Sequence, residues 1–228
     1  MIGIIAAMPV ELEEICKEIT DVRHESAGGI NFTLGSLNGH EVVAAVSGIG
    51  KVNAAMCTQA MILTFSPRLV INTGVAGSLS KELSVYDVAV ATDVVEHDMD
   101  TTPLGDPPGF ISGPDVVKMP ACTELVEALC AKANELGTKL LPGTVASGDV
   151  FVCDRAVKNS IAEKFGAVAC EMEGAAIGHV CYINKVPFMV IRSISDSADD
   201  TADVSFSEFC PVAASVASKI VKIIVDIA

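Results

Sequence analysis

Residues 1–14 read MIGIIAAMPVELEE, an apolar run followed at once by a proline and three glutamates. The uninterrupted apolar run at 2–7 is typical of a strand that is covered on both faces. Pro9 suits the first turn of a helix, where no N–H is needed, and acidic residues are favoured beside the positive end of the helix dipole. We therefore predict a strand that leads directly into a helix from Pro9 to about Ile19.

The same alternation of strand and helix continues along the chain. A hairpin is expected from strands at 30–37 and 40–46, because the Asn38-Gly39 pair between them favours a two-residue hairpin turn. The remaining expected elements are strands at 69–73, 85–96, 140–147, 168–171 and 187–194, and helices at 52–65, 123–136, 155–164, 172–183 and 206–227. Residues 101–120 contain five prolines and are expected to form a long irregular loop of the kind that is usually functional. The pattern predicts an α/β fold, in which residues 1–228 form one domain with a twisted mixed sheet flanked by helices.

Composition excludes several classes of function. The 228 residues include 29 acidic and 15 basic side chains, for a net charge of −14, which disfavours binding to nucleic acid or to an anionic membrane. The eight cysteines form no C-x-x-C pair and sit mostly in apolar runs, so we expect reduced thiols and a cytoplasmic protein. The N-terminal segment lacks the basic start of a signal peptide, and no apolar run is long enough to span a bilayer.

Acidic side chains follow three of the expected strands, at the sheet edge where α/β proteins bind ligands. They are Glu11, the pair Glu171 and Glu173, and Asp196, with Arg192 close by in the sequence. We expect only one of Glu171 and Glu173 to face a shared pocket. Carboxylates that converge in an apolar pocket raise one another's pKa, so one can act as an acid and another as a base. Each also has a structural interpretation: a helix-dipole carboxylate at 11, a buried hydrogen-bonding group at 173 and a loop or N-cap residue at 196.

Other motifs favour neither a metal nor a cofactor. The glycine segments at 48–50 and 74–77 lack the lysine of a Walker A loop and do not match G-x-G-x-x-G. The motif His97-Asp98-x-Asp100 resembles a metal-binding pair, but no further ligand lies within sequence range, and a network that anchors a loop is the preferred interpretation.

A series of motifs resembles one enzyme family over residues 1–210. In order, the motifs are I-G-I-I-x-A-M-x-x-E from residue 2, S-G-I-G-K-V-N-A-A from 47, I-N-T-G-x-A-G from 71, H-D-x-D from 97, S-G-D-x-F from 147, E-M-E-x-x-A-I-x-H-V-C from 171, R-S-I-S-D from 192 and S-F-x-E-F from 205. Together they resemble the 5′-methylthioadenosine/S-adenosylhomocysteine nucleosidases of the nucleoside phosphorylase superfamily. The resemblance implies hydrolysis of the N-glycosidic bond, with release of adenine and a thioribose for methionine salvage, in a homodimer without cofactor or metal.

The resemblance also implies residue roles. Asp196 would protonate N7 of adenine, Glu11 would activate water, and Glu173 would bind the ribose hydroxyls. The residues expected to contact or support the nucleoside around them are Met8, Ile49, Val75, Phe151, Val152, Met172, Arg192, Ser195 and Phe206, with Leu104 from the 101–104 segment of a neighbouring subunit. A Met-rich apolar wall suits the thioether of such a substrate.

Three alternatives remain open at this stage. The first is a phosphate-dependent purine nucleoside phosphorylase; water is favoured because Arg192 alone of the four arginines is expected in the pocket, beside the repelling charge of Glu11. The second is a nucleosidase for another purine derivative, such as deoxyadenosine or futalosine, because Val75 replaces a serine common in the family that the chain resembles, and the 103–113 loop lacks the aromatic residues often found there. The third is a nucleoside-binding sensor without turnover.

Overall fold

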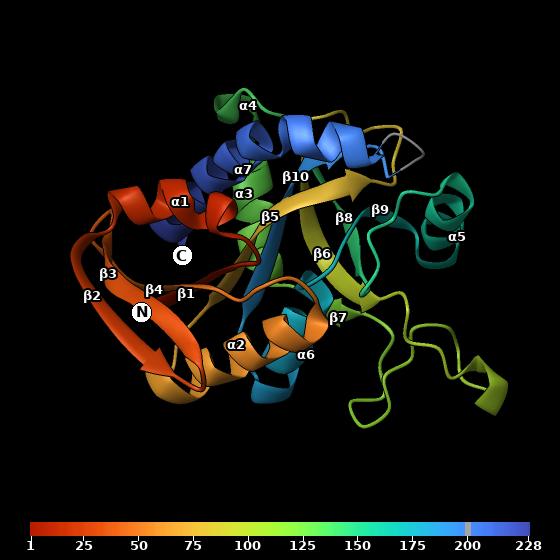
Figure 1. Ribbon diagram of the computed structural model, residues 1–228, viewed down its shortest axis with the longest axis horizontal. Helices are drawn as coiled ribbons and strands as arrows, with labels where there is room; N and C mark the ends of the chain where they lie inside the picture. The colour runs from red at the N-terminus through yellow and green to blue at the C-terminus, as the bar shows by residue number, and fades with distance from the viewer. Residues whose placement is uncertain (199–201) are drawn as a thin grey trace.

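A computed structural model describes residues 1–198 and 202–228, apart from the side chains at 134, 135, 203–205 and 207. It shows a 10-stranded mixed sheet with helices on both faces (Figure 1), which confirms the predicted α/β class. The strands are β1 (Ile2–Ala6), β2 (Thr20–Ala27), β3 (Ile30–Leu37), β4 (His40–Val46), β5 (Val70–Ser78), β6 (Val88–Glu96), β7 (Met119–Pro120), β8 (Leu140–Ser147), β9 (Ala167–Glu171) and β10 (Phe188–Asp196). The helices are α1 (Pro9–Glu18), α2 (Lys51–Phe65), α3 (Thr123–Ala131), α4 (Ala133–Leu136), α5 (Arg155–Phe165), α6 (Gly174–Asn184) and α7 (Ala202–Ile227), with a short 3₁₀ helix, η1 (Thr102–Leu104).

Strand β5 is the centre of the sheet. It pairs in parallel with β1 and β10 and antiparallel with β9. The strands β10, β6, β8, β9 and β5 follow one another and return to β10, so they close a ring, while β1, β4, β3 and β2 extend from β5 as an open sheet. The parallel pairing brings the carboxyl ends of β1, β5 and β10 to one edge, where ligands are expected.

Helices cover both faces of the sheet, so its central strands are fully enclosed. Figure 1 shows α1 and α7 on one side and α2 and α6 on the other. Every residue of β1, β5 and β10 is buried, which explains the uninterrupted apolar sequence of β1 and the apolar start of β10 at 188–191. Among the described residues, no helix combines the length and the hydropathy needed to cross a lipid bilayer.

Most predicted elements are confirmed within a few residues, but β2 was not predicted. The expected helix at 123–136 is divided into α3 and α4, and the expected irregular loop at 101–120 contains η1 and β7. The hairpin has the predicted bounds, and Asn38 and Gly39 adopt φ angles of 51° and 83°, as a mirror-image turn requires. Strand β2 pairs with β3 at the sheet edge and is exposed along nearly its whole length. Because neither face of β2 is buried, its polar sequence carries no alternating hydrophobic pattern.

Candidate active site

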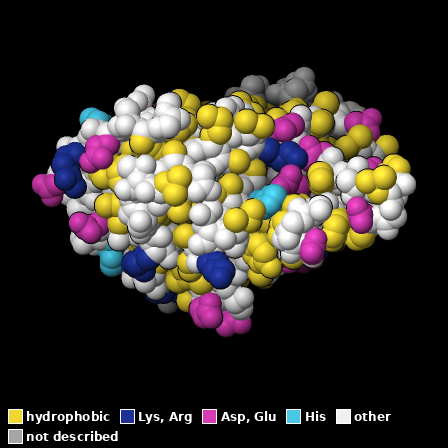
Figure 2. All heavy atoms as spheres, turned by 90° about the horizontal axis from the view of Figure 1, so that it is seen from below, with side chains coloured by type: hydrophobic (Ala, Val, Ile, Leu, Met, Phe, Trp, Pro, Cys, Tyr) yellow, Lys and Arg dark blue, Asp and Glu magenta, His cyan; other side chains and the backbone are white. Residues whose placement is uncertain are grey.

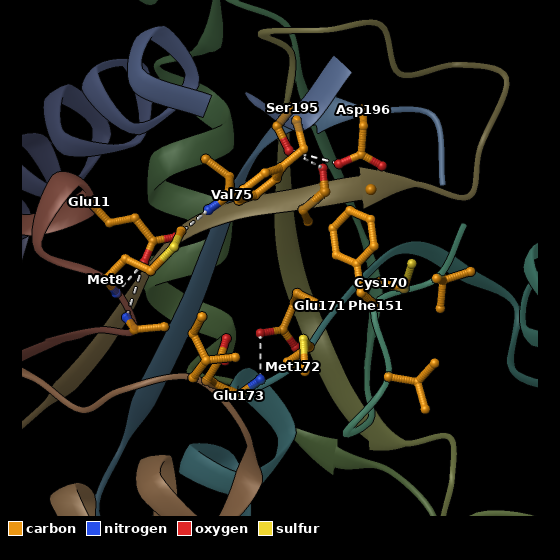
Figure 3. A pocket seen from close by; sticks show the side chains of 17 residues that line it. Met8, Glu11, Val75, Phe151, Cys170, Glu171, Met172, Glu173, Ser195 and Asp196 are labelled. Atoms are coloured by element: carbon orange, nitrogen blue, oxygen red, sulfur yellow. Dashed lines mark hydrogen bonds between the residues drawn. The ribbon is translucent and has the colours of Figure 1, made fainter. Parts of the chain in front are cut away.

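A cavity of about 260 Å³ opens at the carboxyl ends of β1, β5, β9 and β10 (Figure 3). Four acidic side chains line it: Glu11, Glu171, Glu173 and Asp196. No lysine or arginine among the described residues belongs to its lining. The cavity therefore favours a ligand without negative charge.

Glu11 lies on one side of the cavity, in the first turn of α1. Its Oε2 accepts the backbone N–H groups of Ala7 and Met8 at 3.0 and 2.9 Å, and its Oε1 accepts that of Val75 at 3.0 Å. The side chain therefore lies in the first turn of α1, where the helix dipole favours a carboxylate, and lines the cavity as well. Burial raises the pKa of Glu11, and the charge of Arg192 and the three N–H groups oppose that rise only in part.

Asp196 lies on the opposite side of the same cavity, at the end of β10 (Figure 3). Its Oδ2 accepts the hydroxyl of Ser195 at 2.9 Å, and its Oδ1 accepts the backbone N–H of Ala198 at 2.8 Å. Ser195 thus supports Asp196, as expected. These bonds fix the carboxyl group on the cavity wall, where it faces Glu11 across the space for a ligand.

Both Glu171 and Glu173 line the cavity, so the expectation that only one would do so is wrong. Strand β9 ends at Glu171, and Glu173 is the N-cap of α6, with φ −136° and ψ −37°. Residues two apart along a strand share a face, and the turn into α6 keeps Glu173 on the cavity side. Burial and the neighbouring Glu171 raise the pKa of Glu173 to about 7, against the attraction of Arg192.

Arg192 was expected among the residues that contact a ligand, but it does not belong to the cavity lining. Its side chain is fully buried, and Nη2 donates to the side chains of Glu171 and Asn72. A Cβ added at Gly74 would collide with both Arg192 and Glu11, so this glycine lets the two groups face each other. Arg192 therefore acts from behind the wall, as a counter-charge for the carboxylates, because Glu171 and Asn72 hold it there.

The rest of the lining is mostly apolar. The rings of Phe151 and Phe206 meet edge to face, with centroids 5.6 Å apart, and Phe151 is 42% exposed at the cavity mouth. The other expected contact residues in the lining are Met8, Ile49, Val75, Val152 and Met172. Leu104 is not in the lining; it is 83% exposed on η1.

The segment His97–Asp100 joins a hydrogen-bonded network. Asp98 accepts the Lys51 ammonium at 2.7 Å and the backbone N–H of Asp149 at 2.9 Å. Within the described part of the chain, no three His, Cys, Asp or Glu side chains are grouped so as to hold a metal ion. These contacts support the loop-anchoring interpretation of the motif.

Comparison with known proteins identifies the family of the chain. The family model of the phosphorylase superfamily matches residues 1–226. The 5′-methylthioadenosine/S-adenosylhomocysteine nucleosidase of Staphylococcus haemolyticus is 40% identical, and the match covers 100% of both chains. The chain belongs to this nucleosidase family. A solved family member, from Neisseria meningitidis in complex with methylthio-immucillin-A, superimposes with a TM-score of 0.96 at 38% identity and covers 100% of this chain and 99% of that one.

A solved structure of a second enzyme is nearly as similar to the chain. The futalosine hydrolase of Helicobacter pylori superimposes with a TM-score of 0.94 at 38% identity, covering 100% of this chain and 97% of that one. Overall similarity therefore identifies the family and the fold.

Glu171 lines the site, but the sequence analysis assigned no role to it. Its Oε2 accepts the backbone N–H groups of Glu173 and Gly174 at 2.9 and 2.8 Å and also pairs with Arg192. Its Oε1 accepts the hydroxyl of Ser147. Glu171 therefore joins β8, β10 and the start of α6. The signal for this role was an acidic residue at a strand end directly before a helix.

Proposed function

We propose that the chain hydrolyses the N-glycosidic bond of 5′-methylthioadenosine and S-adenosylhomocysteine, releasing adenine and the thioribose. The observation that carries this proposal is a cavity with an acidic residue on each side and no basic side chain among its described lining residues. A phosphorylase must hold a phosphate anion, for which arginine, lysine and backbone donors are the usual ligands. An uncharged nucleoside and water suit this cavity better.

The charges of the transition state match the two sides of the cavity. As the bond between C1′ and N9 breaks, positive charge develops on the ribose and negative charge on the purine. Asp196 donates a proton to N7 and so neutralises the leaving base. Glu11 takes a proton from the water that attacks C1′, and its negative charge lies on the side of the ribose. Such placed charges in a dry cavity commonly provide a large part of a rate enhancement.

The remaining lining residues orient the nucleoside. Ionised Glu173 accepts hydrogen bonds from the ribose hydroxyls, Phe151 stacks on the purine, and the backbone of Val152 faces the purine edge. Met8, Ile49 and Phe206 form the apolar surface for the 5′-thioalkyl group, where a polarisable sulfur is favoured beside Met and aromatic rings. Arg192 does not touch the nucleoside in this scheme and acts on the carboxylates.

Adenine release should not require phosphate. We expect the purified protein to release adenine from 5′-methylthioadenosine and S-adenosylhomocysteine in phosphate-free buffer, because water is the nucleophile. Liquid chromatography of the products checks this, with inosine as the comparison substrate. Strict dependence on added phosphate would identify a phosphorylase, and tight binding of the nucleoside without any product would identify a sensor.

Futalosine is the second candidate substrate. The similarity to the Helicobacter pylori futalosine hydrolase favours its inclusion, as does Val75, whose apolar side chain lines the cavity where many family members carry serine. In the same assay, a higher kcat/KM for futalosine than for 5′-methylthioadenosine would make this the main activity. The same acid and base would serve both substrates.

We also propose that the protein is a cytoplasmic, single-domain subunit of a homodimer in which the partner's 101–104 segment closes the cavity. The face formed by α2 and α6 carries exposed hydrophobic side chains and few charged ones (Figure 2). They are Val52, Met56, Leu63, Tyr182 and Ile183. Large exposed apolar side chains gathered on one face are typical of an interface.

Light scattering should therefore give the mass of two chains. The Leu104→Ser variant should raise the KM for 5′-methylthioadenosine by about tenfold or more, because full burial of a leucine side chain contributes about 1.5–3 kcal/mol. This effect would come from a residue outside the cavity of its own chain. A monomer with full activity would contradict the proposal.

A further inference from the structure

We propose that Lys51 is a positioning residue for ribose binding: it anchors the N-terminus of α2 so that the backbone N–H of Gly50 holds the Glu173 carboxylate. This inference rests on the proposed function, because it concerns how the nucleoside's ribose is recognised. Lys51 itself does not line the cavity. Lys51 acts on Glu173 through the backbone of Gly50, the residue before it.

The contact between Gly50 and Glu173 links α2 to the site. The Gly50 N–H donates to Oε1 of Glu173 at 2.8 Å. Gly50 is the N-cap of α2 with a φ of 96°, a conformation that other residues rarely adopt. The direction of this N–H therefore depends on how the start of α2 is held.

Lys51, the next residue, holds that start at two points. Its ammonium contacts Glu96 at 2.9 Å and Asp98 at 2.7 Å, and its backbone N–H donates to Oδ1 of Asp149 at 2.8 Å. Asp149 in turn donates its own N–H to Asp98 at 2.9 Å. The end of β6, the 148–149 turn and the start of α2 are thus joined by one lysine.

The environment of Lys51 differs from that of an ordinary surface ion pair. Its side chain is only 17% exposed, whereas that of Lys17, which also bridges two carboxylates, is 58% exposed. Exposed pairs contribute little, because water and salt screen them. The network around Lys51 is better protected, and it adjoins a group of the site directly.

Glu173 needs this support because its surroundings oppose ionisation. Burial, Glu171 and Glu11 raise its pKa, while Arg192 and the Gly50 N–H lower it. Loss of the Gly50 contact should raise that pKa further. Since ribose hydroxyls donate to the ionised carboxylate, the pH below which KM rises should then move upward. The charged and titratable groups packed around Lys51 are its partners Glu96 and Asp98, with His97 beside Asp98 and His179 in contact with Glu96.

The test compares Lys51→Met with Lys51→Arg and with the matched surface variant Lys17→Met. We expect Lys51→Met to raise the KM for 5′-methylthioadenosine about tenfold and to change kcat less than about threefold, because a hydrogen bond to a charged acceptor is worth roughly that ratio. The pH at which KM begins to rise should shift upward in the same variant. Lys51→Arg should keep KM within about threefold of wild type, since it retains a charged donor to both carboxylates. Lys17→Met should change nothing.

A double-mutant cycle decides whether the effect passes through Glu173. In the Glu173→Gln background, Lys51→Met should change KM less than about twofold. If Lys51→Met does not fold, Asp149→Ala, which removes the acceptor for the same backbone, carries the same expectations. An unchanged KM and pH profile, or an equal effect in both backgrounds, would overturn this inference alone. A wild-type protein that releases no adenine would overturn the proposed function, and the inference with it.

Discussion

Asp196→Asn should lower the turnover of 5′-methylthioadenosine by roughly 10²-fold or more, the usual size of a general-acid contribution. The amide has nearly the shape of the carboxyl group, and its oxygen can still accept the Ala198 N–H that Asp196 accepts at 2.8 Å. It cannot transfer a proton to N7, so the purine must leave with its negative charge. Initial rates of adenine release measure the effect, while KM should change little.

Asp226→Asn is the matched control, because Asp226 is exposed near the end of α7, where its Oδ1 accepts a hydrogen bond from the side-chain amide of Asn38. It should leave turnover at the wild-type value. If Asp196→Asn retains full turnover with a folded protein, Asp196 is a structural residue of the β10 end and the assignment of the acid is wrong.

Glu11→Gln should lower kcat by about 10²–10⁴-fold, the range of general-base catalysis. Glutamine cannot take the proton of the attacking water, and it removes the negative charge from the ribose side of the cavity. It also places an N–H₂ group where the carboxylate accepts three backbone N–H groups, so some loss of stability is expected in addition. Thermal unfolding of the same sample separates this loss from the loss of catalysis.

The pH profile gives a second measure of the same residue. A general base must be ionised, so kcat of the wild type should fall as the pH drops through the pKa of Glu11, which burial raises above its ordinary value. This acid limb should be absent in Glu11→Gln. Glu14→Gln changes an exposed glutamate one turn along the same helix and should leave both kcat and the limb intact. Unchanged turnover in Glu11→Gln would show that Glu11 is not the general base.

The candidate acid and base could be found in the sequence because each follows a strand with a recognisable apolar pattern. A continuous apolar run predicts a strand buried on both faces, and its carboxyl end is where an α/β sheet presents polar groups. Glu11 and Asp196 satisfied this rule, and the structure places both on one cavity. Their roles remain predictions for the variants above.

The structural position of Arg192 was not predictable in this way. Its place in a buried strand was correct, but a long side chain can turn toward several neighbours, and here Glu171 and Asn72 hold it behind the cavity wall. The function of Glu171 and of the Gly50 N–H was missed for a related reason. Each depends on a contact between segments that are distant in the chain, and a local sequence pattern does not predict such contacts.

The amino-acid order alone was sufficient for the fold class, the Asn38-Gly39 hairpin and the acidic character of the strand ends, because these depend on local periodicity, turn preference and charge. Tertiary packing decided the pairing of the polar edge strand β2 and the closure of the β5–β10 ring. It also decided which partners hold each carboxylate. Those features depend on the pairing of segments distant in the chain, and no local sequence pattern encodes their geometry.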